Sequence, residues 1–151
     1  MTKNNVSISS LKTDYHFDNF FNISADFICI AGFDGYFKRI NPAVSKLLGF
    51  TEEELYSRPI SSFVYTADLQ ITLETREQVY KNKPLLNFEN RYLTKSGEIV
   101  WLSWTSMPVE SEKLVYAIAK NITHKKKNGR GAQFTDCKFD TNQQRTNGFV
   151  S

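Results

Sequence analysis

The C-terminal half of the sequence contains three consecutive runs of strand-forming residues, and this feature restricts the fold more than any other. The runs span residues 86–93, 99–109 and 114–122, and the segments between them are only residues 94–98 and 110–113. Segments this short join antiparallel strands as hairpins, and Gly97 supplies the positive φ that such a turn requires. This part of the chain is therefore predicted to form an antiparallel sheet.

Two further strands are predicted nearer the N-terminus. Residues 26–31 are rich in β-branched and aromatic side chains and lead to Asp34-Gly35, a sequence typical of a hairpin turn. Residues 36–40 then form the return strand. A helical turn or two, starting at residues 18–21, precedes this hairpin.

Short helices are predicted between the two groups of strands. Asn41 and Pro42 are typical of a helix start, with a side-chain acceptor at the N-cap and proline at the first helical position. Gly49 ends this helix. The next helix starts at Thr51, which is placed to form a capping box with Glu54.

The longest predicted helix covers residues 67–81, where apolar residues recur at helical spacing. The order of two strands, several short helices and three strands predicts an α+β fold, with the helices gathered on one face of an antiparallel sheet. A chain of 151 residues has room for one such domain. We place it at residues 18–123, after an N-terminal extension of residues 1–17 and before a tail of residues 124–151.

The basic residues are concentrated in that tail. The sequence has a net charge of +3 and a pI of about 8.8. From His124 onward, however, six basic residues stand against two acidic ones: Lys125, Lys126, Lys127, Arg130, Lys138 and Arg145 against Asp136 and Asp140. Residues 1–123 are therefore slightly acidic, so we expect no nucleic-acid binding by the folded domain.

The sequence predicts a cytoplasmic protein without a membrane span. No apolar run approaches the roughly 18 residues that a span needs, and residues 1–10 lack the order of a signal peptide. Cys29 and Cys137 form neither a disulfide framework nor a metal-binding knuckle. His16 and His124 have no further ligands beside them in the sequence, so we expect no metal site.

Several short motifs are spread along residues 18–123. They are Asp34-Gly35, Asn41-Pro42-Ala43, Leu48-Gly49-Phe50-Thr51-Glu52-Glu53-Glu54-Leu55, the group Glu89, Arg91, Lys95, Gly97, Glu98 and Trp101, and finally Asn121-Ile122-Thr123. Together they resemble a PAS domain, including the PAC motif of its C-terminal half. The resemblance implies a five-stranded antiparallel sheet in the spatial order 2-1-5-4-3, with the helices enclosing a small cavity.

The resemblance also implies a sensory role in signal transduction. Such a domain binds a small ligand or a partner and relays the change to an output domain, which this sequence does not contain. The implied partners are a second copy of the chain, as a homodimer, and an output such as a histidine kinase of a two-component system. The alternative is a ligand-free PAS module that works by dimerisation, with its cavity filled by side chains.

We expect neither haem nor flavin as the cofactor, whose identity the sequence leaves open. The helix over residues 67–81 contains no histidine to serve as a haem ligand. The light-sensing subgroup of the family carries its cysteine in an Asn-Cys-Arg-Phe stretch beside the helices, whereas Cys29 lies on the predicted first strand. No nucleophile is paired with a base, so we expect no catalysis by the domain itself.

Eight residues are candidates for the ligand pocket: Cys29, Phe63, Leu73, Asn90, Tyr92, Ser103, Trp104 and Thr105. The polar members on the strands are suited to orienting a ligand. Trp101 and Trp104, three positions apart on one strand, are predicted to face opposite sides of the sheet. Which alternate set of strand residues faces the cavity stays open.

Asn121, Ile122 and Thr123 are the candidate signal exit, because the family usually ends in Asp-Ile-Thr at this point. With Asn121 in place of the acidic residue, a neutral hydrogen bond takes the place of a salt bridge. This substitution is expected to weaken the exit of the signal.

We expect the tail beyond Thr123 to be disordered as written. Lys125-Lys126-Lys127-Asn128 is a stretch that a long run of adenines can encode, and such runs readily lose or gain a base. One choice of codons, read one base later, places leucine or isoleucine at the alternating steps of a coiled coil. A frameshift is therefore one hypothesis for the tail. The other is a native basic extension that binds acidic partners.

Overall fold

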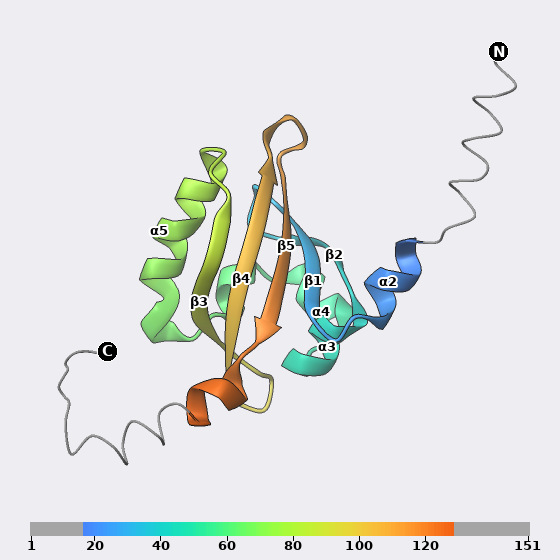
Figure 1. The fold of residues 1–151 in the computed structure, drawn as a ribbon, viewed down its shortest axis with the longest axis vertical. Coiled ribbons are helices and arrows are strands. Elements are labelled where there is room, and N and C mark those ends of the chain that lie inside the picture. Colours follow the sequence, from blue (N-terminus) through green and yellow to red (C-terminus); the bar gives the residue numbers. More distant parts are fainter. Residues whose placement is uncertain (1–16, 129–151) are drawn as a thin grey trace, which may run out of the picture.

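The computed structural model describes residues 17–128 (Figure 1). Its elements are α2 (Phe17–Ile23), β1 (Phe27–Gly32), β2 (Phe37–Ile40), α3 (Pro42–Leu48), α4 (Glu52–Ser57), η1 (Ile60–Phe63), η2 (Thr66–Asp68), α5 (Leu69–Tyr80), β3 (Leu85–Leu93), β4 (Ile99–Val109), η3 (Glu110–Glu112) and β5 (Leu114–Asn121). Residues 123–128 are also helical.

The five strands form one antiparallel sheet in the order β2-β1-β5-β4-β3, which confirms the predicted topology. The first strand of the chain, β1, pairs with the last strand, β5, in the middle of the sheet. The long β3–β4 hairpin lies to one side and β2 to the other (Figure 1). This arrangement brings residues from both ends of the domain to one sheet face.

The helices α3, α4 and α5 lie on the same face of the sheet (Figure 1). Side chains alternate along the strands, so every second residue of β4 from Val100 to Pro108 is buried and the intervening ones are more exposed. The core consists of this inner face and the apolar sides of the helices, and its largest fully buried side chains include Phe27, Phe63 and Tyr92. The helices and the inner face of the sheet thereby form two layers, and a space between α5 and the sheet lies between them.

The predicted starts of α3 and α4 are confirmed, with one correction. Thr51 and Glu54 form the capping box, with the Thr51 N–H donating to Glu54 Oε1 over 2.8 Å and the Glu54 N–H donating to Thr51 Oγ1 over 3.1 Å. Asn41 precedes Pro42 as expected, but its side chain does not cap the helix. Asn41 Oδ1 instead accepts from the Ile28 N–H over 3.0 Å, because the side chain is buried beside β1.

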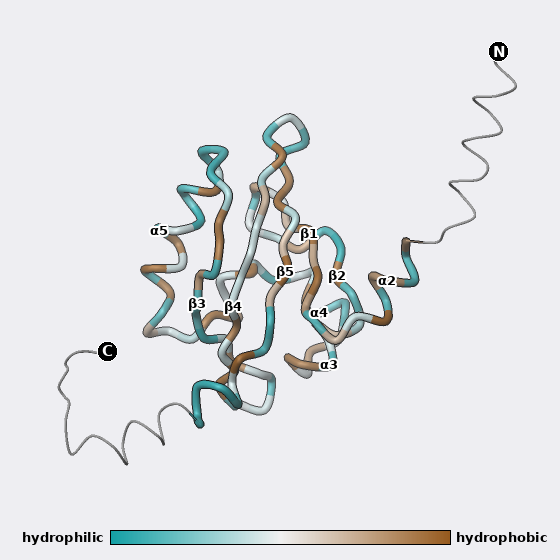
Figure 2. The backbone as a smooth tube through the Cα atoms, viewed as in Figure 1, coloured by the Kyte–Doolittle hydropathy of each residue, from teal (hydrophilic) through white to brown (hydrophobic). Residues whose placement is uncertain are grey.

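The C-terminal boundary differs from the prediction. Residues 124–128, assigned to the tail, continue as a short helix that is strongly hydrophilic (Figure 2). Lys126 Nζ lies 2.7 Å from Glu89 Oε1 and 4.8 Å from the centre of the Trp101 ring, which fixes this helix against β3 and β4. The predicted disorder of the tail does not hold for residues 124–128, which are helical. For residues 129–151 disorder stays a prediction, as does the frameshift, because these residues lie outside the described part, as do residues 1–16.

None of the helices within residues 17–128 combines the length and the apolar character needed to cross a membrane.

Candidate functional site

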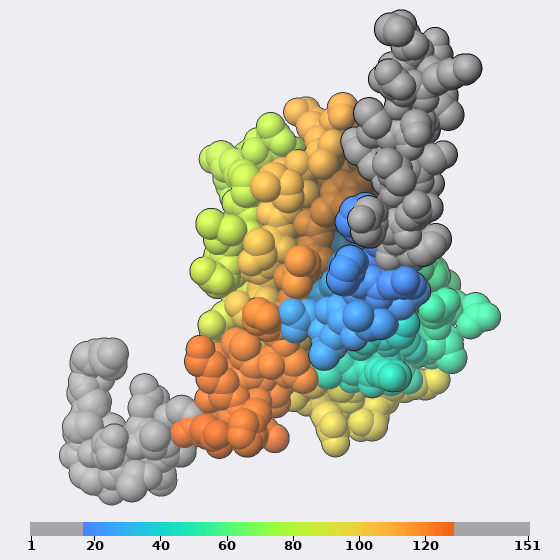
Figure 3. All heavy atoms as spheres, turned by 45° about the vertical axis from the view of Figure 1, so that its right-hand side comes forward, coloured from blue at the N-terminus to red at the C-terminus, as the bar shows by residue number. Residues whose placement is uncertain are grey.

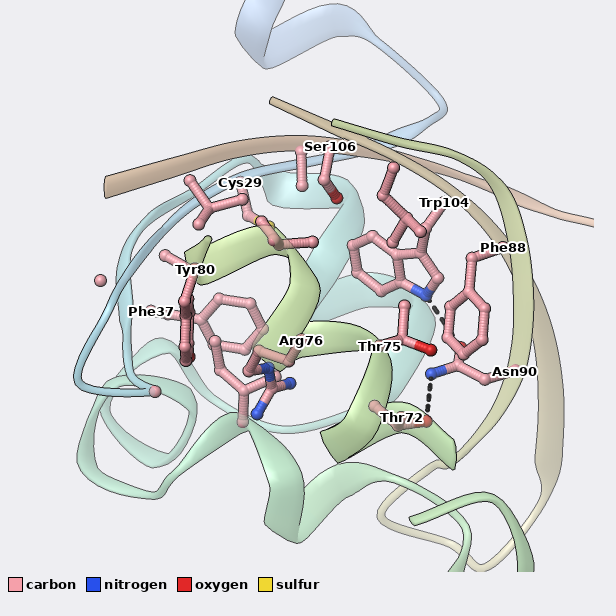
Figure 4. Close-up of a pocket in the computed structure, with 18 of the residues that line it drawn as sticks. Cys29, Phe37, Thr72, Thr75, Arg76, Tyr80, Phe88, Asn90, Trp104 and Ser106 are labelled. Atoms are coloured by element: carbon pink, nitrogen blue, oxygen red, sulfur yellow. Dashed lines mark hydrogen bonds between the residues drawn. The ribbon is translucent and has the colours of Figure 1, made fainter. Parts of the chain in front are cut away.

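A cavity of about 90 Å³ lies between α5 and the inner face of the sheet (Figure 4). Its lining comes from all five strands and the β1–β2 turn, from the start of η1, and from one side of α5. The lining residues are Cys29, Ala31, Gly32, Gly35, Phe37, Ile60, Thr72, Thr75, Arg76, Val79, Tyr80, Leu85, Phe88, Asn90, Tyr92, Trp104, Ser106, Val115 and Ala117. The walls are mostly apolar, and a few polar groups converge on the space.

The structure brings four of the predicted pocket residues together. Cys29 on β1, Asn90 and Tyr92 on β3, and Trp104 on β4 all line the cavity, and all are buried. They occupy the inward set of alternate strand positions, which the sequence left open. Trp101 lies on the other side of β4, as its spacing from Trp104 predicted.

The other four predicted residues do not line the cavity. Ser103 and Thr105 belong to the outward set of β4, because their positions alternate with the inward Trp104. Leu73 is 39% exposed and lines a groove on the outer side of α5. Phe63 is buried in the core beneath Phe50, with ring centroids 5.0 Å apart, and does not reach the cavity.

Sequence reasoning missed the polar residues that α5 and β4 contribute. Thr72, Thr75 and Arg76 line the cavity from α5, and Ser106 lines it from β4 (Figure 4). The signal for the three α5 residues was the i, i+3, i+4 spacing that they share with Val79. Because three of these residues are polar or charged, the spacing did not appear as an apolar stripe.

Asn90 is the centre of a buried hydrogen-bond network. Its Nδ2 donates to Thr72 Oγ1 over 3.0 Å, and its Oδ1 accepts from Trp104 Nε1 over 2.8 Å (Figure 4). The Asn90 side chain thus connects α5 to β4 across the end of the cavity. Each polar atom of its amide already has one protein partner, so its first role is to hold these elements in register.

Burial dominates the acid–base properties of two cavity residues. It raises the pKa of the Cys29 thiol to about 12, and the positive charge of Arg76 offsets part of this rise. Burial likewise raises the pKa of the Tyr92 hydroxyl, again with Arg76 acting in the opposite direction. Both groups are therefore protonated at neutral pH, and Cys29 lacks the thiolate that nucleophilic or redox chemistry needs.

Gly35, Arg76 and Tyr80 form the boundary between the cavity and the outer groove of α5, because they line both. The Tyr80 ring stacks on Phe33 with centroids 4.8 Å apart. Gly35 has a φ of 87° and is followed by β2, so the first hairpin turn lies at the same opening. The opening is therefore formed by α5 and by the β1–β2 turn.

A series of contacts leads from α5 to the C-terminal helix. Asp68, just before α5, accepts from the Arg91 N–H over 2.8 Å and from Arg91 Nε over 2.9 Å. The Arg91 guanidinium in turn lies 5.0 Å from the centre of the Trp101 ring. Trp101 is also the ring that Lys126 contacts, so the start of α5 and the C-terminal helix share neighbours on β3 and β4.

The three predicted exit residues form the junction between β5 and that helix. Asn121 Oδ1 accepts from the Thr123 N–H over 3.1 Å and from Thr123 Oγ1 over 2.6 Å. The Trp101 N–H donates to Thr123 Oγ1 over 2.9 Å, and the Ile122 N–H donates to the Trp101 carbonyl oxygen over 2.9 Å. Asn121 thus makes neutral hydrogen bonds at the position where the resemblance implies a carboxylate.

Within residues 17–128 no group of three or more His, Cys, Asp and Glu side chains is arranged to hold a metal ion.

Comparisons with known proteins agree with this geometry. A probable diguanylate cyclase of Escherichia coli is 26% identical over 91 residues, which are 60% of this chain and 8% of that protein. A PAS domain from Colwellia psychrerythraea superposes with a TM-score of 0.63 at 24% identity, covering 76% of this chain and 98% of the other. A domain of a sensory box sensor histidine kinase/response regulator from Geobacter sulfurreducens gives a TM-score of 0.62 at 18% identity, covering 69% and 90%.

These likenesses to solved structures show a shared fold, and the chain spans less than a tenth of the length of the curated relative. The family model described as the PAS fold matches residues 37–120, more than half of the sequence. This match covers β2 through β5, all the elements that enclose the cavity except β1. The chain belongs to the PAS fold family.

Proposed function

We propose that this PAS domain is a sensory module that binds a small ligand in the cavity behind α5 and has no catalytic activity of its own. The observation that carries the proposal is the cavity itself, an apolar space with polar groups from α5, β3 and β4 at its walls. Its volume of about 90 Å³ is below the roughly 300 to 1,000 Å³ of drug-sized ligand sites. We therefore propose a ligand much smaller than haem or flavin.

The proposed relay runs from α5 to the C-terminal helix. A ligand that displaces α5 acts on Asp68 and, through the Asp68–Arg91 contacts, on the surroundings of Trp101. Lys126 and Thr123 both contact Trp101 from the C-terminal side. The change is thereby passed to the residues through which an output would be connected.

Heat stability tests the ligand proposal. We would measure the melting temperature of the full 151-residue chain against a panel of small neutral, cationic and anionic metabolites. A concentration-dependent rise is expected for at least one class, because a ligand that binds the folded state stabilises it. In Ala117→Val, which adds two methyl groups to the cavity wall, the rise should be lost.

Thr105→Val is the matched control, since it changes a side chain on the outer face of the same sheet. It should keep the rise in melting temperature. If no compound raises the melting temperature of the unmodified chain, ligand sensing is contradicted and dimerisation becomes the proposed function.

The outer face of the sheet favours this second function, a homodimer. Met107, Tyr116 and Ile118 are neighbours on β4 and β5, and 54%, 41% and 46% of their surfaces are exposed. Atoms of these two strands lie on the surface beside α2 (Figure 3), and Phe20 of α2 is 66% exposed. We propose that a second copy of the chain covers this apolar surface.

Sedimentation tests the dimer. The unmodified chain should sediment as a dimer at micromolar concentration, and Ile118→Asp should sediment as a monomer because it introduces a charge into the apolar surface. Thr105→Asp, at the position paired with Ile118, is expected to weaken the dimer less. Glu110→Gln, in the turn after β4, is the control that should leave the dimer intact. A monomeric unmodified chain would contradict the proposal.

We propose a cytoplasmic location and an output on another segment or another protein, of the histidine kinase or cyclic-dinucleotide type that its relatives suggest.

Sequencing the DNA across the codons for Lys125 to Asn128, and several hundred bases beyond, distinguishes the two hypotheses for the tail. A coiled coil and an output domain in the next frame would support the frameshift. An unbroken frame would support a stand-alone PAS protein with a separate partner.

A further inference from the structure

We propose that the ligand of the cavity is a small carboxylate whose acyl chain carries a further oxygen, such as a short 2-oxo acid, and that Arg76 is its charge partner. This inference rests on the proposed ligand-sensing function and specifies its chemistry. It follows from three features of the cavity: the position of Arg76, the buried hydroxyl groups, and the volume.

Arg76 is a half-buried cation at the boundary of an apolar cavity (Figure 4). Among residues 17–128 no carboxylate lies within salt-bridge distance of its guanidinium, and no protein group there forms a hydrogen bond with it. Partial burial of a charge is costly unless an opposite charge or a hydrogen bond compensates. A carboxylate fits this position because its two oxygens match the paired N–H donors of a guanidinium.

The acidic residues near the opening do not fill this role. Asp34 is paired with Lys38 Nζ at 2.8 Å. Glu74 accepts from Gln70 Nε2 over 2.8 Å, and Glu77 is exposed on the outer side of α5. Arg76 is also close enough to buried Cys29 and Tyr92 to offset part of the rise in pKa that burial causes in both. Its positive charge therefore acts on groups inside the cavity as well as at the opening.

Two buried hydroxyl groups are available to a second polar group of the ligand. Tyr92 and Ser106 are 2% and 7% exposed and line the cavity. In the part of the chain that the structure describes, neither hydroxyl forms a hydrogen bond with another protein group, although buried polar groups are normally paired. The pKa of Tyr92 keeps its hydroxyl protonated, so it is able to donate to a carbonyl oxygen.

The volume limits the chain length. At about 30 Å³ for a group the size of water, 90 Å³ holds roughly three such groups. With the carboxylate at the opening beside Arg76, the remainder of a 2-oxo acid of about three to four carbons fits between α5 and the sheet. Val79, Leu85 and Ala117 supply the apolar wall for it.

Calorimetric titration of the full chain with 2-oxobutyrate, butyrate and butyramide tests the inference. We expect 2-oxobutyrate to bind most tightly, butyrate more weakly, and the uncharged amide at least about tenfold more weakly than butyrate, because it lacks the charge that pairs with Arg76. Arg76→Gln should lower the affinity for both acids by at least about tenfold and leave the amide unchanged. Tyr92→Phe should weaken 2-oxobutyrate and leave butyrate unchanged.

Lys81→Gln is the control, because it removes the same charge from an exposed position at the end of α5. It should bind all three compounds like the unmodified chain. Equal affinity for acid and amide, or full affinity for the acids in Arg76→Gln, would overturn the proposal that the ligand is a carboxylate paired with Arg76. The proposed ligand sensing would stay in place. Failure of all three compounds to bind would overturn the inference too, and the wider metabolite panel would then decide whether the cavity binds any ligand.

Discussion

Asp68 and Arg91 are joined by three hydrogen bonds: Asp68 accepts from the N–H, the Nε and the Nη2 of Arg91. Asp68 precedes α5 and Arg91 lies in the middle of β3, so one side-chain pair sets where the helix begins relative to the sheet. The Asp68 side chain is only 12% exposed, and the hydrogen bonds from Arg91 lower its pKa. These contacts position the helix that covers the cavity.

Asp68→Asn is expected to destabilise the domain by about 1–3 kcal/mol at pH 7, because it weakens charge-assisted hydrogen bonds in a partly buried site. A carboxyl group whose pKa is lowered by folding stabilises the folded state above its unfolded value of 3.8. That stabilisation is lost as the pH falls through the folded value. Urea unfolding of both proteins should therefore show a difference that is full at pH 7 and shrinks below about pH 4.

Asp26→Asn is the comparison for this measurement. Asp26 pairs with Lys120 at 3.1 Å on the surface, where the two side chains are 37% and 70% exposed. Its removal should cost less than about 1 kcal/mol. Equal losses for the two variants would show that the Asp68 pair does not contribute more than a surface ion pair.

Asn90→Leu should destabilise the domain by about 1–3 kcal/mol and shift the Trp104 fluorescence. The substitution leaves Trp104 Nε1 and Thr72 Oγ1 without their partners inside the protein. Urea unfolding and the emission spectrum in a Trp101→Phe background measure both effects. In Asn87→Ala, on the exposed part of β3, the emission maximum should not move. An unchanged emission in Asn90→Leu would contradict the network.

Cys29 should be almost inert to thiol reagents in the folded protein. A rise of its pKa from 9.0 to about 12 lowers the thiolate fraction at pH 8 by about a thousandfold, and burial adds a steric barrier. In a Cys137→Ser background, labelling with a maleimide at pH 8 should be slow for the folded chain and fast in concentrated denaturant. Rapid labelling without denaturant would mean that the cavity opens often enough to admit the reagent.

Asn121→Asp should stabilise the junction between β5 and the C-terminal helix by about 0.3–1 kcal/mol at low salt. A carboxylate accepts the Thr123 N–H bond more strongly than an amide does, and a negative charge is favourable near a helix N-terminus. Asn121→Ala should have the opposite effect, since it removes both hydrogen bonds to Thr123. The free energy of unfolding of both variants, measured at one pH with and without about 0.5 M salt, checks the direction of each stability change and how far salt screens the effect of the new charge.

The strands and hairpins could be predicted from strand-forming runs and short turns, whereas the order of the strands in the sheet came from the resemblance to PAS domains. The bounds of β4 were predicted as found, and those of β3 and β5 to within one residue. The predicted start of the long helix at residue 67 was early, since α5 begins at Leu69. Asp68 stays in a 3₁₀ turn, where its carboxylate reaches Arg91, and this tertiary contact has no local signal in the sequence.

The cavity was predicted less completely, for two physical reasons. β4 carries bulky or polar residues at both alternating sets of positions, so Ser103 and Thr105 could not be told from Trp104 and Ser106 by pattern alone. Arg76 was missed because a charged residue on a helix is usually solvated, and only the packing of α5 on the sheet places it at the cavity.

The two ends of α5 are held unequally. Near its start, Asp68 and Thr72 are tied to β3 by hydrogen bonds, whereas at its end Tyr80 rests on the ring of Phe33. In the proposed sensory role, we expect ligand exchange to depend on movement of the end of α5 beside the opening, because the start of the helix is held to β3 by hydrogen bonds. On this proposal, the residence time of a ligand follows the rate of that movement, and the domain would respond to a ligand concentration averaged over that time.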